Sequence, residues 1–185
     1  MGRLSEQLKQ PFVIDFKPGG STTIGLAFLA RSAPDGYTLL LASGSLSLVP
    51  LRQIALPFDP LTAFAPVSLL SKRWSSILMH PSVPRTVKEL FAWARANPGK
   101  LNYPSIGVGS TQHFAGELLF QLAGGLQLTH VPYRGATQGL TDVIGGQVHL
   151  YMSSVPTLIG HIKSGKLRAL AVPSLQRVDD LPQVP

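Results

Sequence analysis

From residue 86 onward, apolar segments of strand length alternate with segments of helical periodicity, and this alternation constrains the fold more than any other feature. Thr86 and Glu89 have the spacing of a capping box at the start of a helix, and Asn97 begins an Asn-Pro-Gly sequence that ends it. Later strands are expected at 100–105, 128–133, 147–154 and 166–174. Short strand–helix connections are typical of βαβ units, so the sequence predicts an α/β fold with a mainly parallel sheet.

The residues before this region show a less regular pattern. Residues 11–15 and 37–43 are apolar runs of strand length, and the second is typical of a strand that is buried on both faces. Residues 23–33 have helical periodicity, and the irregular stretch near 60–82 indicates a boundary. We expect a first lobe over 1–75, a second lobe over 76–174 and a connecting segment over 175–185.

Composition excludes several kinds of site. The chain is 44% hydrophobic and 14% charged, as globular proteins are, and without cysteine it has neither a disulfide framework nor a zinc–thiolate site. The formal net charge of +7 favours anionic partners, but the basic residues are scattered, so no nucleic acid is expected. We find no P-loop lysine, no nucleophile elbow and no closely spaced histidine pair, and therefore expect no enzyme, no metal and no cofactor.

Small and hydroxylic residues follow several of the apolar strands, just ahead of expected helices. They are Ser43-Gly44-Ser45, Ser105 through Thr111, Arg134 through Thr137, and Ser153-Ser154. Helix N-termini carry free N–H groups that bind anions, and ligands of open α/β sheets lie beyond the carboxyl ends of the strands. A single loop of this kind is more commonly only a helix cap, whereas recurrence at successive strands favours a carboxylate site.

Nearly the whole chain resembles the Bug-type periplasmic substrate-binding proteins of tripartite tricarboxylate transporters. The most specific motifs are APDGYTLL (33–40) and HVPYRGATQGLTDVIGGQV (130–148), supported by KPGGSTTIG (17–25) and GSTQHFAGELL (109–119). The resemblance implies a periplasmic-binding-protein-like fold of type II, with two lobes built on mainly parallel sheets. It also implies that the first lobe is incomplete, because the family's first strand and its C-terminal return segment have no counterpart here.

What the resemblance implies about function is non-enzymatic capture of a small organic anion, a carboxylate, by hinge closure, and delivery to membrane transporter subunits. The expected protein is a periplasmic monomer. The N-terminus shows no signal peptide, so a chain complete as written would be cytoplasmic. The ligand-binding candidates are Ser43, Ser45, Gly109, Ser110, Thr111, His113, Gly135, Ala136 and Ser153.

Two departures from the family pattern bear on the site. Ser153 stands where the family often has Asp, which disfavours a ligand with a cationic ammonium group, and Ser21 and Thr22 stand where two glycines are common. Three alternatives stay open. The first is a ligand-sensing domain of the same fold, as in LysR-like regulators. The second is an α/β enzyme acting on an anion, and the third is a fragment that has lost its function.

Overall fold

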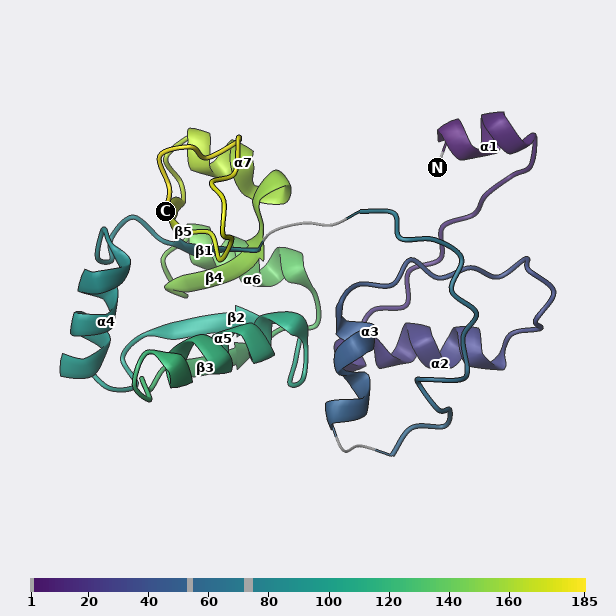
Figure 1. Ribbon diagram of the computed structural model, residues 1–185, viewed down its shortest axis with the longest axis horizontal. Helices are drawn as coiled ribbons and strands as arrows, with labels where there is room; N and C mark the ends of the chain where they lie inside the picture. The colour runs from purple at the N-terminus through teal and green to yellow at the C-terminus, as the bar shows by residue number, and fades with distance from the viewer. Residues whose placement is uncertain (1, 53–54, 72–74) are drawn as a thin grey trace.

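The computed structural model describes residues 2–52, 55–71 and 75–185, which form two spatially distinct parts (Figure 1). The N-terminal part comprises the described residues up to 71, on the right of Figure 1, and the C-terminal part comprises residues 75–185 on the left. The lobe boundary expected near residue 75 adjoins residues 72–74, which lie outside the described residues.

The C-terminal part is built on five strands. β1 (Ser75–Met79) lies between β4 (Leu150–Ser154) and β5 (Arg168–Ala171) and pairs antiparallel with both. β2 (Asn102–Ser105) pairs in parallel with β3 (Thr129–Pro132). The two sheets meet where the His149 N–H donates to the Asn102 side-chain oxygen over 2.9 Å.

The antiparallel pairing of β1 differs from a purely βαβ arrangement. β4 and β5 follow each other through the helical crossover α7, which favours their parallel alignment, and β1 lies between them in the opposite direction. The alternation that predicts the later strands therefore carries no information about the direction of β1.

Helices cover both faces of the larger sheet. They are α4 (Val87–Ala96), α5 (Thr111–Leu122), α6 (Ala136–Ile144) and α7 (Val155–Lys163). Ile77 and Met79 of β1 pack in one core cluster with residues of α4 and α5, while Leu78 between them packs with residues of α6 and α7. This period of two places one hydrophobic core on each side of β1. A third cluster joins Leu181 and Val184 of the C-terminal segment to α7.

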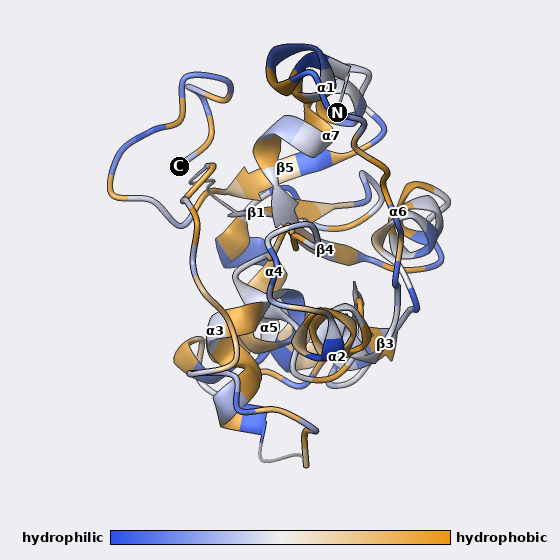
Figure 2. Cartoon of the chain, turned by 90° about the vertical axis from the view of Figure 1, so that its right-hand side faces the viewer, coloured by the Kyte–Doolittle hydropathy of each residue, from blue (hydrophilic) through white to orange (hydrophobic). Residues whose placement is uncertain are grey.

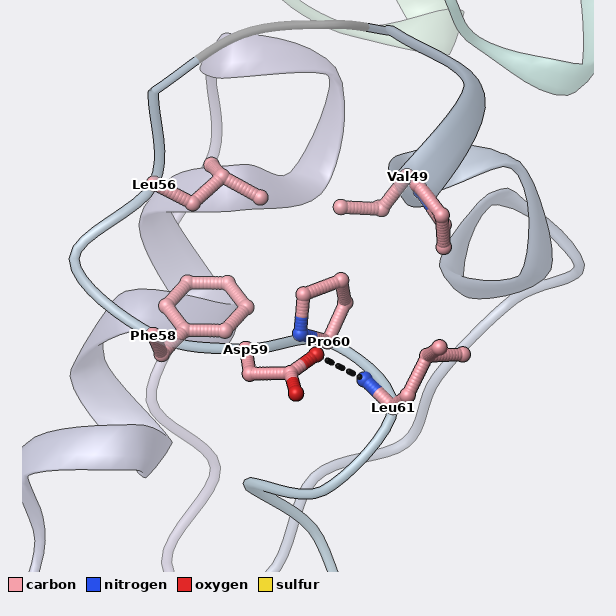
Figure 3. A pocket seen from close by; sticks show the side chains of 7 residues that line it. Val49, Leu56, Phe58, Asp59, Pro60 and Leu61 are labelled. Atoms are coloured by element: carbon pink, nitrogen blue, oxygen red, sulfur yellow. Dashed lines mark hydrogen bonds between the residues drawn. The ribbon is translucent and has the colours of Figure 1, made fainter.

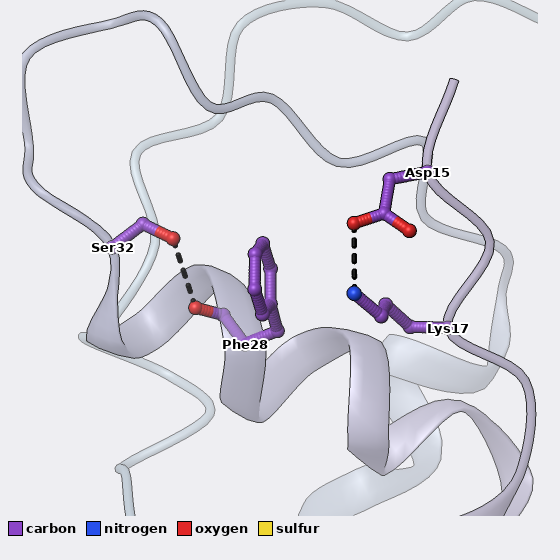
Figure 4. A network of polar contacts seen from close by, with 4 residues as sticks. All are labelled: Asp15, Lys17, Phe28 and Ser32. Carbon is purple, nitrogen blue, oxygen red and sulfur yellow. Dashed lines mark hydrogen bonds and ion pairs between the residues drawn. The ribbon is translucent and has the colours of Figure 1, made fainter. Parts of the chain in front are cut away.

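The N-terminal part is mostly irregular. Its helices are α1 (Gly2–Leu8), α2 (Thr23–Arg31) and α3 (Ser45–Leu48), with single 3-10 turns η1 (Gly20–Thr22) and η2 (Val49–Arg52). The segment before η1 is attached to α2 through Lys17, whose Nζ lies 2.8 Å from Asp15 and 4.7 Å from the centre of the Phe28 ring (Figure 4).

The strands expected at 11–15 and 37–43 are a wrong prediction for this structure, because both segments are irregular and form no strand pairing. The described residues before β1 contain no strand, so neither segment has a neighbour to supply ladder hydrogen bonds. Their side chains are correspondingly open to solvent, with Val13 90% and Leu41 76% exposed instead of buried. Figure 2 shows hydrophobic residues, in orange, along such irregular connections as well as on the helices. No helix in the described ranges has both the length and the hydrophobicity needed to span a bilayer.

Candidate ligand-binding site

The loop between β2 and α5, residues 106–110, is shaped by hydroxyl groups at its two ends. The Gly107 N–H donates to Ser105 Oγ over 2.9 Å, which turns the chain back immediately after the strand. Ser110 is the N-cap of α5, and its Oγ accepts from the His113 N–H over 3.4 Å. Ser110 therefore has the capping role that its position before the helix predicts.

The first turn of α5 keeps two backbone donors unused. Among the described residues, the N–H groups of Thr111 and Gln112 donate no hydrogen bond. Free N–H groups at the positive end of a helix are donors for an anion. The Oε1 atom of Gln112 is also buried without a hydrogen-bond partner in the described structure.

The N-terminal part contributes hydroxyls to the same place. Ser45, which is fully buried at the start of α3, places its Oγ 3.5 Å from Thr111 Oγ1 of α5. Ser43 supports Ser45, because its Oγ accepts from the Ser45 N–H over 3.3 Å. The structure thus brings together three predicted site residues, Ser43, Ser45 and Thr111, from regions 66 positions apart in sequence.

Two further residues of the N-terminal part contact the loop directly. Ser21 Oγ donates to the Val108 carbonyl over 2.9 Å, and Arg52 Nε donates to the Gly109 carbonyl over 2.8 Å. Arg52 also donates to the Ser21 carbonyl over 2.9 Å. Burial lowers the pKa of the Arg52 guanidinium, and no carboxylate in the described ranges forms an ion pair with it.

A pair of histidines supports the loop from the C-terminal part. His113 Nδ1 accepts from the Gly109 N–H over 3.3 Å, and its ring centre lies 4.4 Å from that of His130. His130 Nε2 is 2.6 Å from Ser105 Oγ. Burial, and secondarily the nearby charge of His113, lowers the pKa of His130, whereas Glu117 acts in the opposite direction. His113 thus has the local hydrogen-bonding role that its sequence position allowed.

The remaining predicted residues form a separate group around Tyr151. Gly135 is the N-cap of α6, and the Ala136 carbonyl accepts from Tyr151 Oη over 3.3 Å. Burial raises the pKa of Tyr151, and a hydrogen bond with the Ser153 side chain opposes that shift. Thr111 follows β2, Gly135 and Ala136 follow β3, and Ser153 lies at the carboxyl end of β4. No hydrogen bond between described residues joins Gly135, Ala136 or Ser153 to Thr111.

A cavity in the N-terminal part is lined mainly by apolar residues. It measures about 240 Å³ and is lined by Val49, Pro50, Leu56, Phe58, Asp59, Pro60 and Leu61 (Figure 3). Asp59 uses its two carboxylate oxygens on the Leu61 N–H and the Thr62 hydroxyl, each at 2.9 Å. Across the described ranges, no group of three or more His, Cys, Asp or Glu residues could hold a metal ion.

Sequence reasoning missed Ser21, Arg52 and His130 as parts of the site. Arg52 lies in a proline-interrupted stretch without periodicity, so nothing in its surroundings indicates a partner 57 residues away. Ser21 carried a usable signal, because it stands where the family commonly has glycine. Its observed φ of 49° lies in the left-handed region that glycine adopts without strain.

Comparisons with known proteins agree with this architecture. BugT of Bordetella pertussis is 35% identical over 189 residues, which cover 98% of this chain and 56% of BugT. A solved Rhodopseudomonas palustris protein with adipate is 33% identical with a TM-score of 0.92, over all of this chain and 62% of that one. MatC from the same species, with bound malate, is 25% identical with a TM-score of 0.88, over 98% of this chain and 62% of MatC.

These matches settle the fold class as that of the periplasmic binding proteins, with an incomplete set of elements. The chain spans about half the length of the curated relatives it matches. The family model for the tripartite tricarboxylate transporter family receptor matches residues 2–185. The chain belongs to the tripartite tricarboxylate transporter receptor family.

Proposed function

We propose that this chain contributes the carboxylate-binding site of a periplasmic solute receptor, which captures a small organic acid and delivers it to a membrane transporter. The unused N–H groups of Thr111 and Gln112 carry this proposal, because they lie at a helix N-terminus where the two parts of the chain meet. The adipate and malate in the two solved relatives support dicarboxylates as the ligand class.

Residues 1–75 and 76–174 then act as two lobes, with 175–185 as a connection. One ligand carboxylate accepts from the α5 N–H groups and from the Thr111 hydroxyl, and the buried Ser45 positions that hydroxyl from 3.5 Å away. Gly109, Ser110 and His113 shape the loop before α5, and Ser43 supports Ser45. In this proposal the distal end of the ligand binds at Gly135, Ala136 and Ser153. A ligand hydroxyl, or a water held by the ligand, that donates to Gln112 Oε1 would recover the free energy that this buried acceptor now loses.

We also propose that the site binds without catalysis and that the protein acts as a monomer. The Ser–His contact at the loop, between Ser105 and His130, serves structure in this proposal. Ser105 is only 3% exposed, and its Oγ already accepts from the Gly107 N–H. That hydroxyl is therefore not presented to a ligand as a nucleophile.

Thr111→Pro tests the binding site with little disturbance of the helix. Thr111 occupies the first helical position of α5, where proline is well tolerated, and Ser110 already has φ −75° and ψ 163°, as a residue before proline requires. The variant deletes one N–H donor and the Thr111 hydroxyl, so we expect adipate and malate affinity, measured by calorimetry, to fall by roughly tenfold or more.

Two control variants accompany this experiment. Val87→Pro introduces proline at the first position of α4, distant from the loop, and should leave affinity unchanged. Thr111→Val removes only the hydroxyl and should give a smaller loss than Thr111→Pro. Unchanged affinity in Thr111→Pro would show that the ligand binds elsewhere, and a wild-type chain that binds neither acid would refute the proposed ligand class for this chain.

A further inference from the structure

Ser21 is held in a backbone conformation that its residue type disfavours. Its φ and ψ of 49° and 46° are left-handed, and the following Thr22 has φ 81°. A left-handed conformation is unfavourable for a residue with a Cβ, because the Cβ comes too close to the following carbonyl oxygen. Ser21 is nevertheless buried, with 6% of its surface exposed, and its hydroxyl is hydrogen-bonded. These contacts indicate that its surroundings compensate for the backbone strain.

The compensation comes from the opposite part of the chain. Ser21 Oγ reaches the Val108 carbonyl at 2.9 Å and the Ile106 carbonyl at 3.3 Å, 87 and 85 residues away. Arg52 donates from Nε to the Gly109 carbonyl and from its two terminal nitrogens to the carbonyls of Ser21 and Gly20. The guanidinium thereby joins η1 to the loop before α5.

The two glycines of the loop make room for these contacts. A Cβ on Gly107 would lie 2.5 Å from Ser21 Oγ, and one on Gly109 would lie 2.7 Å from Arg52 Nε. Both glycines have positive φ, 117° and 75°. The loop is therefore shaped to admit Ser21 and Arg52, and its carbonyls face them.

We propose that Ser21 and Arg52 form a latch that holds the two parts of the chain together at the ligand loop. They are positioning residues: they bind loop carbonyls at Val108 and Gly109, and leave the N–H groups of Thr111 and Gln112 free for a carboxylate. This inference rests on the proposed function for what the latch serves. The latch itself exists independently of any ligand.

The positive charge of Arg52 links the latch to the ligand. Through its bond to the Gly109 carbonyl, the guanidinium lies next to the N-terminus of α5, which carries a partial positive charge of its own. Two positive groups meet there without an ion-paired carboxylate among the described residues. An anionic ligand would offset the positive charge of Arg52 and of the α5 N-terminus. Anion binding and latch closure should therefore reinforce each other.

Distances between spin labels test the latch. The chain has no cysteine, so Ala33→Cys and Gln121→Cys, both at exposed positions after α2 and on α5, give one label in each part. Arg52→Met, Arg52→Lys and Ser21→Ala are compared with Thr22→Gly. That control relaxes an adjacent left-handed residue without touching the loop.

We expect one narrow distance distribution in the ligand-free wild type and in Thr22→Gly. Each of the three latch variants should broaden it toward longer distances, and saturating adipate should narrow it again. Adipate and malate affinities should fall about tenfold in Arg52→Met, because only a fraction of the protein remains competent to bind. Arg52→Lys should give an intermediate loss, since it keeps the charge and loses the planar fork.

The outcomes separate the latch from the proposed function. Unchanged ligand-free distributions in all three variants would overturn the latch, even if Arg52→Met weakened binding, since Arg52 would then act by charge alone. If the wild type binds neither acid but Arg52→Met still broadens the distance distribution, the latch proposal stands and the proposed ligand class is wrong. Circular dichroism of each variant confirms that a broadened distribution reflects opening of a folded protein.

Discussion

Replacing Gly109 by alanine tests whether the loop is built around Arg52. The new Cβ would lie 2.7, 2.8 and 2.9 Å from Nε, Cδ and Cγ of Arg52, so the side chain must move and its bond to the Gly109 carbonyl is lost. The backbone penalty is roughly 1–2 kcal/mol for alanine at φ 75°. Losing a hydrogen bond from a charged group adds about 1.5 kcal/mol, the lower end of its range, because the site is half-exposed.

Gly99→Ala is the matched control. Gly99 has φ 73°, and nothing lies within 4 Å of the position its Cβ would take, so this variant pays only the backbone penalty. At roughly 2–4 °C per kcal/mol for a chain of this size, Gly109→Ala should melt about 3–6 °C below Gly99→Ala. In an Arg52→Met background the two should become equal. Equal melting temperatures in the wild-type background would refute the reasoning.

Three other measurements test the core, a cap and a histidine. Gly116→Ala brings a Cβ to 2.8 Å from the buried Tyr103 ring and should cost about 1–3 kcal/mol in urea unfolding, whereas Gly160→Ala, in open space on α7, should be neutral or stabilising. Thr86→Ala removes the capping box of α4 and should cost about 1 kcal/mol, and a Ser replacement should restore most of it. Because the folded-state pKa of His130 is lowered, its contribution to stability is complete above 6.5 and is lost as pH falls below that value. His130→Gln should flatten this part of the pH profile, and an unchanged profile would contradict it.

The second half of the fold could be predicted because its signals are local. The predicted strand at 128–133 is observed as Thr129–Pro132, and the helix expected after the loop from Ser105 to Thr111 is observed as Thr111–Leu122. N-cap residues and glycines that directly flank these elements in the sequence determine where the elements begin and end. The capping box at Thr86 is confirmed in full, with both of its reciprocal hydrogen bonds.

The first half could not be predicted, because its signals need a partner. The apolar run 37–43 has the composition of a buried strand, but a strand also needs a neighbour, and the described residues provide none. The composition of a segment indicates whether it is suited to a buried strand, but it does not indicate whether a neighbouring strand is present. The site was predictable to the same extent: Thr111 and Ser110 follow from a local helix start, whereas Ser21 and Arg52 depend on contacts across the chain.

The central place of β1 also determines the order in which this sheet can assemble during synthesis. Of the described strands, β1 is synthesised first, yet its two partners are β4 and β5, whose last residues are Ser154 and Ala171. At roughly 5–20 residues per second, β1 waits on the order of several seconds for β4 to emerge. During that time both edges of the Ser-Ser-Ile-Leu-Met segment lack their partners, and an unpaired strand edge can pair with another chain.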